Sequence, residues 1–107
     1  MPRFITRVEL KDSENADYTA LHNEMESRGF ARTIVGRFKG PPQRDVVCDL
    51  PNAEYWFSAD DAKIEAVRDL AKDAAIAIKK KARVLTVEIK TYCFVGLDEA
   101  TEEAGTE

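Results

Sequence analysis

The feature that most limits how this chain can fold is a repeated order of strand-like and helix-like sequence. Residues 4–10 alternate between apolar and polar side chains, as a strand with one buried face does. A helical stripe follows over residues 18–25 and ends before Gly29, a typical residue just past a helix. A second helical stripe lies within residues 60–80, and alternation returns over residues 83–90. The chain therefore contains two similar halves, each with strands around one helix.

The middle of the chain supplies the remaining strands. Residues 30–38 and 45–50 are rich in β-branched side chains and are separated by a Gly-Pro-Pro turn, which predicts a second and a third strand. Pro51 should end the third strand, and the pairing of residues 52–57 stays open. The order β-α-β-β-α-β predicts an α+β, ferredoxin-like sandwich: a four-stranded antiparallel sheet with two helices on one face. Right-handed crossovers give the strand order 4-1-3-2.

Length and charge predict a single domain over residues 1–97. The chain has 107 residues and a net charge of -4, but residues 98–107 carry five acids and no base. That composition predicts a disordered acidic tail. Residues 1–97 carry 16 bases against 15 acids, so the tail's acidity does not exclude a polyanionic partner for the folded part.

Cysteine and histidine usage excludes two classes of small protein. Two cysteines, Cys48 and Cys93, are too few for a disulfide framework, and with His22 as the sole histidine a Cys/His zinc site is nearly excluded. Cys48 alternates in phase with Val46 and Leu50, which predicts a buried small side chain. We expect no resident cofactor, no contact with a membrane and a cytoplasmic location, since the sequence shows no signal region or membrane span.

A basic edge is the main candidate binding site. In the predicted topology the end of the first strand, the hairpin between strands two and three, and the entry to the last strand fall at one edge. That edge would gather bases able to hold an RNA backbone. The candidate nucleic-acid-binding residues are Arg37, Lys39, Arg44, Lys79, Lys80, Lys81 and Arg83. The alternative is a solvated hairpin and a basic helix end.

Two carboxylates beside this edge, Glu9 and Asp12, are the candidate catalytic residues. Near a phosphate track they could act as a general base or, in a nuclease, hold Mg²⁺. Asp12 is equally explained as a helix cap and Glu9 as a residue of the solvated sheet face. His22 is interpreted as a half-buried packing residue rather than a general base. Tyr55 and Trp56 fit either a stacking platform or the closing of a small core.

Short segments of the chain resemble a known family. The segments are Arg7-Val8-Glu9-Leu10, Leu21-His22-Asn23-Glu24-Met25-Glu26, Gly29-Phe30-Ala31-Arg32, Asp49-Leu50-Pro51-Asn52-Ala53-Glu54-Tyr55 and Val95-Gly96-Leu97. Together they are similar to the GhoS-like antitoxins of type V toxin–antitoxin systems. The resemblance implies a ferredoxin-like fold and an endoribonuclease that cuts the messenger of a membrane toxin. The longer segment between the second and third strands departs from the short hairpin of that family.

These observations lead to two functional hypotheses. The first is a GhoS-like, RNA-directed regulator, with an endoribonuclease activity if the family resemblance holds. The second is a binding module without catalysis, either an inhibitor of a host protein carried by a phage or mobile element, or a dimeric interaction domain. Small α+β domains expose sheet faces and edges that suit such contacts, and the fold alone does not decide between the two uses.

Overall fold

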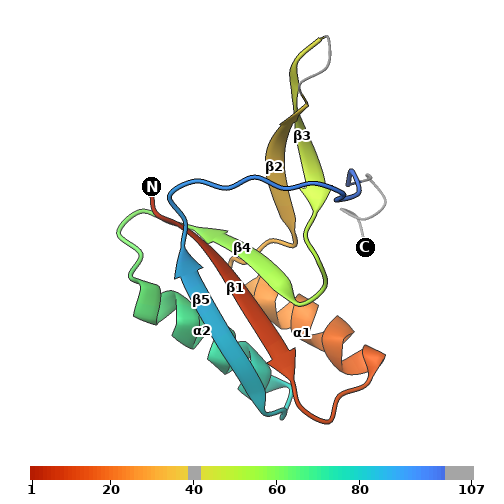
Figure 1. Cartoon of the computed structure of the whole chain (residues 1–107). Coiled ribbons are helices and arrows are strands. Elements are labelled where there is room, and N and C mark those ends of the chain that lie inside the picture. Colours follow the sequence, from red (N-terminus) through yellow and green to blue (C-terminus); the bar gives the residue numbers. More distant parts are fainter. Residues whose placement is uncertain (39–41, 101–107) are drawn as a thin grey trace.

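The computed structural model describes residues 1–38 and 42–100, which form an α+β fold with two antiparallel sheets. A three-stranded sheet has the order β4-β1-β5, and β2 and β3 form a separate hairpin that projects from it (Figure 1). Both helices lie behind the three-stranded sheet in this view. The elements are β1 (Arg3–Leu10), α1 (Asn15–Ser27), β2 (Thr33–Phe38), β3 (Arg44–Asp49), β4 (Glu54–Ser58), α2 (Ile64–Ala77) and β5 (Ala82–Glu88).

The expectation of one four-stranded sheet is therefore wrong. Strand β4, whose pairing the sequence left open, takes the place beside β1 that was predicted for residues 45–50. On its other side β4 forms an isolated bridge with Ala31, whose backbone exchanges hydrogen bonds of 2.8 and 2.7 Å with Trp56. The physical reason lies in side-chain burial: β4 directs Tyr55 and Phe57 toward the core, and two aromatic rings bury more apolar surface than β3 offers.

The core lies between the three-stranded sheet and the helices. The alternating side chains of β1 are buried as predicted, and Leu21 and Met25 of α1 meet them. Helix α2 contributes Val67 and a row of alanines, which lets it lie close to the sheet. One polar pair borders the core: the hydroxyls of the buried Thr6 and the half-buried Thr86 are 2.8 Å apart, so each has a hydrogen-bond partner.

Helix ends follow the sequence signals only in part. Helix α1 begins after Glu14, which forms a capping box with Asp17, rather than after Asp12 or Ser13. Asp12 instead has φ of +49° in the turn after β1. Helix α1 ends as predicted before Gly29, whose φ of +96° lies in the left-handed region that glycine adopts easily.

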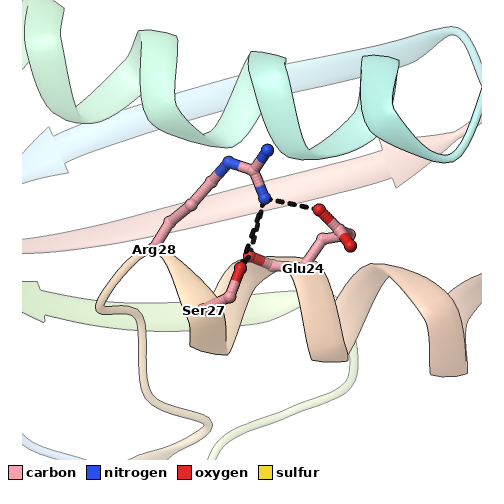
Figure 2. A network of polar contacts seen from close by, with 3 residues as sticks. All are labelled: Glu24, Ser27 and Arg28. Atoms are coloured by element: carbon pink, nitrogen blue, oxygen red, sulfur yellow. Dashed lines mark hydrogen bonds and ion pairs between the residues drawn. The ribbon is translucent and has the colours of Figure 1, made fainter.

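A polar network closes the last turn of α1 (Figure 2). The guanidinium of Arg28 donates to the carboxylate of Glu24 at 2.6 Å and to its backbone carbonyl at 3.0 Å. The same nitrogen lies 3.4 Å from the Ser27 hydroxyl. The bond to the Glu24 backbone gives a donor to one carbonyl group near the helix end, where intrahelical donors run out.

The segment after β5 runs from the three-stranded sheet to the β2–β3 hairpin and crosses the hairpin in Figure 1. The Tyr92 hydroxyl donates to the Val35 carbonyl at 2.5 Å, and the Phe94 ring covers Gly36 so closely that a Cβ there would collide with it. Asp98, the first residue of the predicted tail, accepts a hydrogen bond from the Asp49 amide at 2.9 Å. Residues 98–100 thus lie along β3, and residues 101–107 are outside the described part of the chain.

Two smaller sequence predictions can be compared with the structure. Cys48 is buried in the hairpin, as its phase predicted, whereas Cys93 is exposed. Within residues 1–38 and 42–100, no helix is long and apolar enough to cross a bilayer.

Candidate nucleic-acid interface

The predicted basic residues form two groups at opposite ends of the molecule. In Figure 1 the α2–β5 turn lies at the bottom, and the end of β2 and the start of β3 lie at the top. The predicted gathering of all these bases at one edge is therefore wrong, because the hairpin is not part of the three-stranded sheet and points away from the end of β1. The lower group holds Lys79, Lys80, Lys81 and Arg83, together with Glu9 and Asp12; the upper group holds Arg37 and Arg44, and Lys39 lies outside the described residues.

Polar contacts at the lower end tie the α2–β5 turn to the turn after β1. The Lys11 amide donates to the Lys81 carbonyl at 2.9 Å. The Lys80 ammonium lies 3.2 Å from both the Asp12 carbonyl and the Asp17 carboxylate. A backbone hydrogen bond at Glu14 and then the contact with Lys80 lower the pKa of Asp17. Hydrogen bonds and an ion pair thus fix the position of the lower group in the fold.

The two hairpin bases that the structure describes, Arg37 and Arg44, each lie beside a carboxylate. Arg37 is 3.4 Å from Asp45 across the two strands, and Arg44 is 3.4 Å from Glu99 of the C-terminal segment. All four side chains are at least half exposed. The hairpin end therefore presents paired charges of both signs, which makes it a poorer phosphate track than its bases alone suggested.

The face of the three-stranded sheet that the helices leave uncovered, here called the open face, carries a third set of bases. Because side chains alternate along a strand, the residues between the buried positions of β1 point to this face. The same alternation on the neighbouring strands adds an aromatic ring and two exposed aliphatic side chains. The open face is made of Arg3, Ile5, Arg7 and Glu9 from β1, Glu54, Trp56 and Ser58 from β4, and Arg83, Leu85 and Val87 from β5.

Acidic partners on the open face hold its arginines only weakly. Arg83 donates to Glu9 at 3.1 Å, and Arg7 lies 4.0 Å from Glu54. The Arg83 and Arg7 side chains are 72% and 59% exposed, and ion pairs this exposed contribute only about 0–1 kcal/mol. Both guanidinium groups can therefore exchange a carboxylate for a phosphate with little loss.

Aromatic rings line one end of the open face. Trp56 meets Tyr92 edge to face with ring centres 5.5 Å apart, and Tyr92 lies parallel to Phe94 at 6.5 Å. The Arg3 guanidinium lies 5.8 Å from the centre of the Tyr92 ring. Tyr55 is buried in the core, which fits the core-closing use, whereas Trp56 lies on the open face, where the stacking use stays a prediction.

The two candidate catalytic carboxylates lie near each other but in different settings. Glu9 is on the open face, and its carboxylate accepts a hydrogen bond from Arg83. Asp12 lies beyond the end of the strand, and its carbonyl is held by Lys80. Across the described ranges, no three His, Cys, Asp or Glu side chains gather as a metal site. Mg²⁺ often takes one or two protein carboxylates and completes its shell with phosphate oxygens and water, so both residues stay candidates.

A hydrogen-bonded pair that sequence reasoning missed lies on the helix side of the sheet. The Nδ1 atom of His22 is 2.6 Å from the Tyr55 hydroxyl. Burial, and then the charge of Arg32, lower the pKa of His22 to about 4, while burial raises the pKa of Tyr55. Tyr55 therefore donates to neutral His22. The predicted packing role of His22 fits this place, and its partner could not be predicted because 33 residues separate the two.

Comparison with models of protein families, with curated proteins and with solved structures found no match for this chain. The class defined here is therefore structural: a small α+β domain with a basic, aromatic open sheet face and a projecting hairpin. The resemblance to GhoS-like antitoxins stays a prediction.

Proposed function

We propose that this protein binds single-stranded RNA on its open face. The observation that carries the proposal is an antiparallel sheet face that the helices leave uncovered: it holds Trp56 on β4, Arg3 and Arg7 on the neighbouring strand β1, and Arg83 farther along the sheet on β5. Proteins that bind single strands combine a basic surface with aromatic rings on which bases stack. On the open face Arg7 and Arg83 would hold phosphates, and Trp56 with Tyr92 would receive bases.

The lower group extends this surface beyond the end of β1. Arg83 belongs to the open face and to the lower group, so the two are continuous along β5. A strand that passes from Trp56 along the open face would reach the lysines of the α2–β5 turn. Each phosphate of a single strand that the protein neutralises adds about 0.7 to the slope of the logarithm of the binding constant against the logarithm of the salt concentration. Each stacked base contributes about 1–3 kcal/mol to the free energy of binding.

The first experiment compares two double variants of matched chemistry. Arg7→Gln with Arg83→Gln removes two open-face charges, and Arg37→Gln with Arg44→Gln removes two hairpin charges. Anisotropy of a labelled RNA of about 12 nucleotides should show binding weakened at least about tenfold by the first pair, with a shallower salt slope. The hairpin pair should bind as the native protein does. A loss confined to the hairpin pair would overturn the proposal.

The catalytic part of the proposal rests on the GhoS-like resemblance and on where Glu9 lies. A GhoS-like regulator would cut a toxin messenger, and Glu9 on the open face could take a proton from a 2′-hydroxyl or water once an RNA phosphate engages Arg83. Cleavage of labelled RNAs by the native protein but not by Glu9→Gln with Asp12→Asn, tested with and without magnesium, would support this. Binding without cleavage under either condition would leave an RNA-binding protein that acts by occupancy.

A second candidate function, a protein-binding module without catalysis, rests on a different observation. Leu85 and Val87 are 63% and 45% exposed on β5, the strand at one side of the sheet. Recovery of a stoichiometric protein partner from cells, with no RNA bound or cut, would favour it.

A further inference from the structure

The outer edge of β5 is built to accept another strand. In the part of the chain that the structure describes, β5 has a strand neighbour on one side only, namely β1. The Lys81 carbonyl and the Ile89 amide both bond toward β1, so the odd-numbered residues of β5 direct their backbone groups inward. The even-numbered residues Val84 and Thr86 must then direct their N–H and C=O groups outward, away from β1.

The middle of this edge lacks the features that usually prevent strand pairing. Natural edge strands are protected by proline, bulges or charged side chains. The stretch Val84-Leu85-Thr86-Val87 carries no charge and no proline, and its valines and threonine favour strands. A groove lined by Ile64, Glu65 and Arg68 of α2 and by residues 84–86 runs beside it, and Ile64 is itself 37% exposed.

The charges in the groove beside this edge are complementary to themselves when one copy is turned antiparallel to another. In the groove, Glu65 and Arg68 lie one helical turn apart, and a two-fold axis would bring Arg68 of each copy toward Glu65 of the other.

We infer that the partner of this edge is a second copy of the chain, with β5 pairing antiparallel to β5 across a two-fold axis near Leu85 and Thr86. The axis is perpendicular to the sheet, so the two open faces join on one side of a continuous six-stranded sheet. Leu85 and Val87 of each copy then lie beside those of the other. This inference is independent of RNA binding, since it follows from the edge and not from the bases.

The oligomeric state tests the inference. Sedimentation of the native protein over a range of concentrations should show a species of twice the 12.0 kDa chain mass. Leu85→Lys places two like charges at the axis and should weaken association at least about tenfold. Val35→Lys is the matched control, because Val35 is also an exposed strand residue, at 50%, but lies on the hairpin; it should leave association unchanged.

A charge exchange gives a second measurement that does not depend on Leu85. Arg68→Glu should weaken association, and adding Glu65→Arg should restore it, because the exchanged pair reforms across the axis. Arg68 now lies 2.9 Å from Asp69 in an exposed pair, so its loss should not unfold the chain. A native protein that is monomeric at every concentration, a dimer that survives Leu85→Lys, or a dimer lost only in Val35→Lys would each overturn the inference.

Discussion

Replacing His22 should remove a pH dependence of stability that the structure assigns mainly to the burial of this one imidazole. In the folded protein the pKa of His22 is lowered from 6.5 to about 4, with burial as the larger cause and the charge of Arg32 as the smaller. Protonation would put a hydrogen on Nδ1, the atom that accepts from Tyr55 at 2.6 Å. A lowered pKa on a base means that folding is favoured by its neutral form. The stabilisation is therefore complete above the unfolded pKa of 6.5 and is lost as the pH falls toward 4.

The size of this effect can be worked out for a moderate acid shift. Between about pH 7 and about pH 5 the unfolded chain gains most of a proton at His22, and the folded chain gains almost none. At full burial this difference lowers the free energy of unfolding by about 2 kcal/mol. Because His22 is only half-buried, solvent screening reduces this to about 1 kcal/mol. Asp17, whose pKa is lowered from 3.8, changes stability only below this window.

Urea unfolding of the native protein and of His22→Gln at the two pH values measures this difference. The glutamine amide can still accept from Tyr55 but does not titrate, so the native protein should lose about 1 kcal/mol more than the variant. Tyr55→Phe is the control: it removes the hydroxyl but keeps His22 buried, so it should lower stability at both pH values and retain the pH dependence. Parallel behaviour of native protein and His22→Gln would refute the assignment.

Two further predictions concern packing. Gly36→Val should displace the Phe94 ring and lower the free energy of unfolding by about 1–3 kcal/mol, and the same change in a Phe94→Ala background should do much less harm, a cycle measured by urea unfolding. Equal effects in both backgrounds would show that Phe94 does not cover Gly36. Leu21→Ala should cost about 2–5 kcal/mol because Leu21 is fully buried, whereas Ile76→Ala, at a position 57% exposed, should change stability by less than about 0.5 kcal/mol. Similar losses at the two positions would contradict the described core.

The sequence predicted those elements in which a local pattern of apolar residues marks one buried face. Strand β1 alternates strictly between buried and less buried side chains, and the stripes of α1 and α2 are clear, so each was found to within a few residues. On β5 the alternation was visible, but the sequence did not show which of the two sets of side chains faces the core. Leu85 and Val87 are more apolar than Val84 and Thr86, yet Val84 packs against the core and Thr86 bonds to Thr6. A hydrogen bond between threonines of two different strands cannot be recognised from the sequence of either strand alone.

Long-range pairing could not be predicted from the sequence. Residues 54–58 follow Pro51 and a turn, and their segment is too short for its alternation to outweigh that of residues 45–50. The choice between the two for the place beside β1 depends on which fills the core better, a comparison that requires the assembled helices. This one exchange moved the hairpin out of the sheet and separated Arg37 and Arg44 from Lys79, Lys80, Lys81 and Arg83.

The candidate site shifted for the same reason. Glu9 and Arg83 were both predicted at the end of the first strand, and the observed register of β1 and β5 pairs them. The positions of Arg3, Arg7 and Tyr92 on or beside the open face were missed, since they depend on which sheet face the helices leave open and on the path of the chain after β5.

The most direct test of the central claim uses Trp56, which is the chain's single tryptophan and lies on the open face. Its fluorescence should be quenched saturably when single-stranded RNA of about 12 nucleotides is added, and the quenching should weaken with salt and in the Arg7→Gln, Arg83→Gln double variant. Binding that leaves Trp56 fluorescence unchanged, or no binding at low salt, would contradict the proposal that the open face is an RNA site.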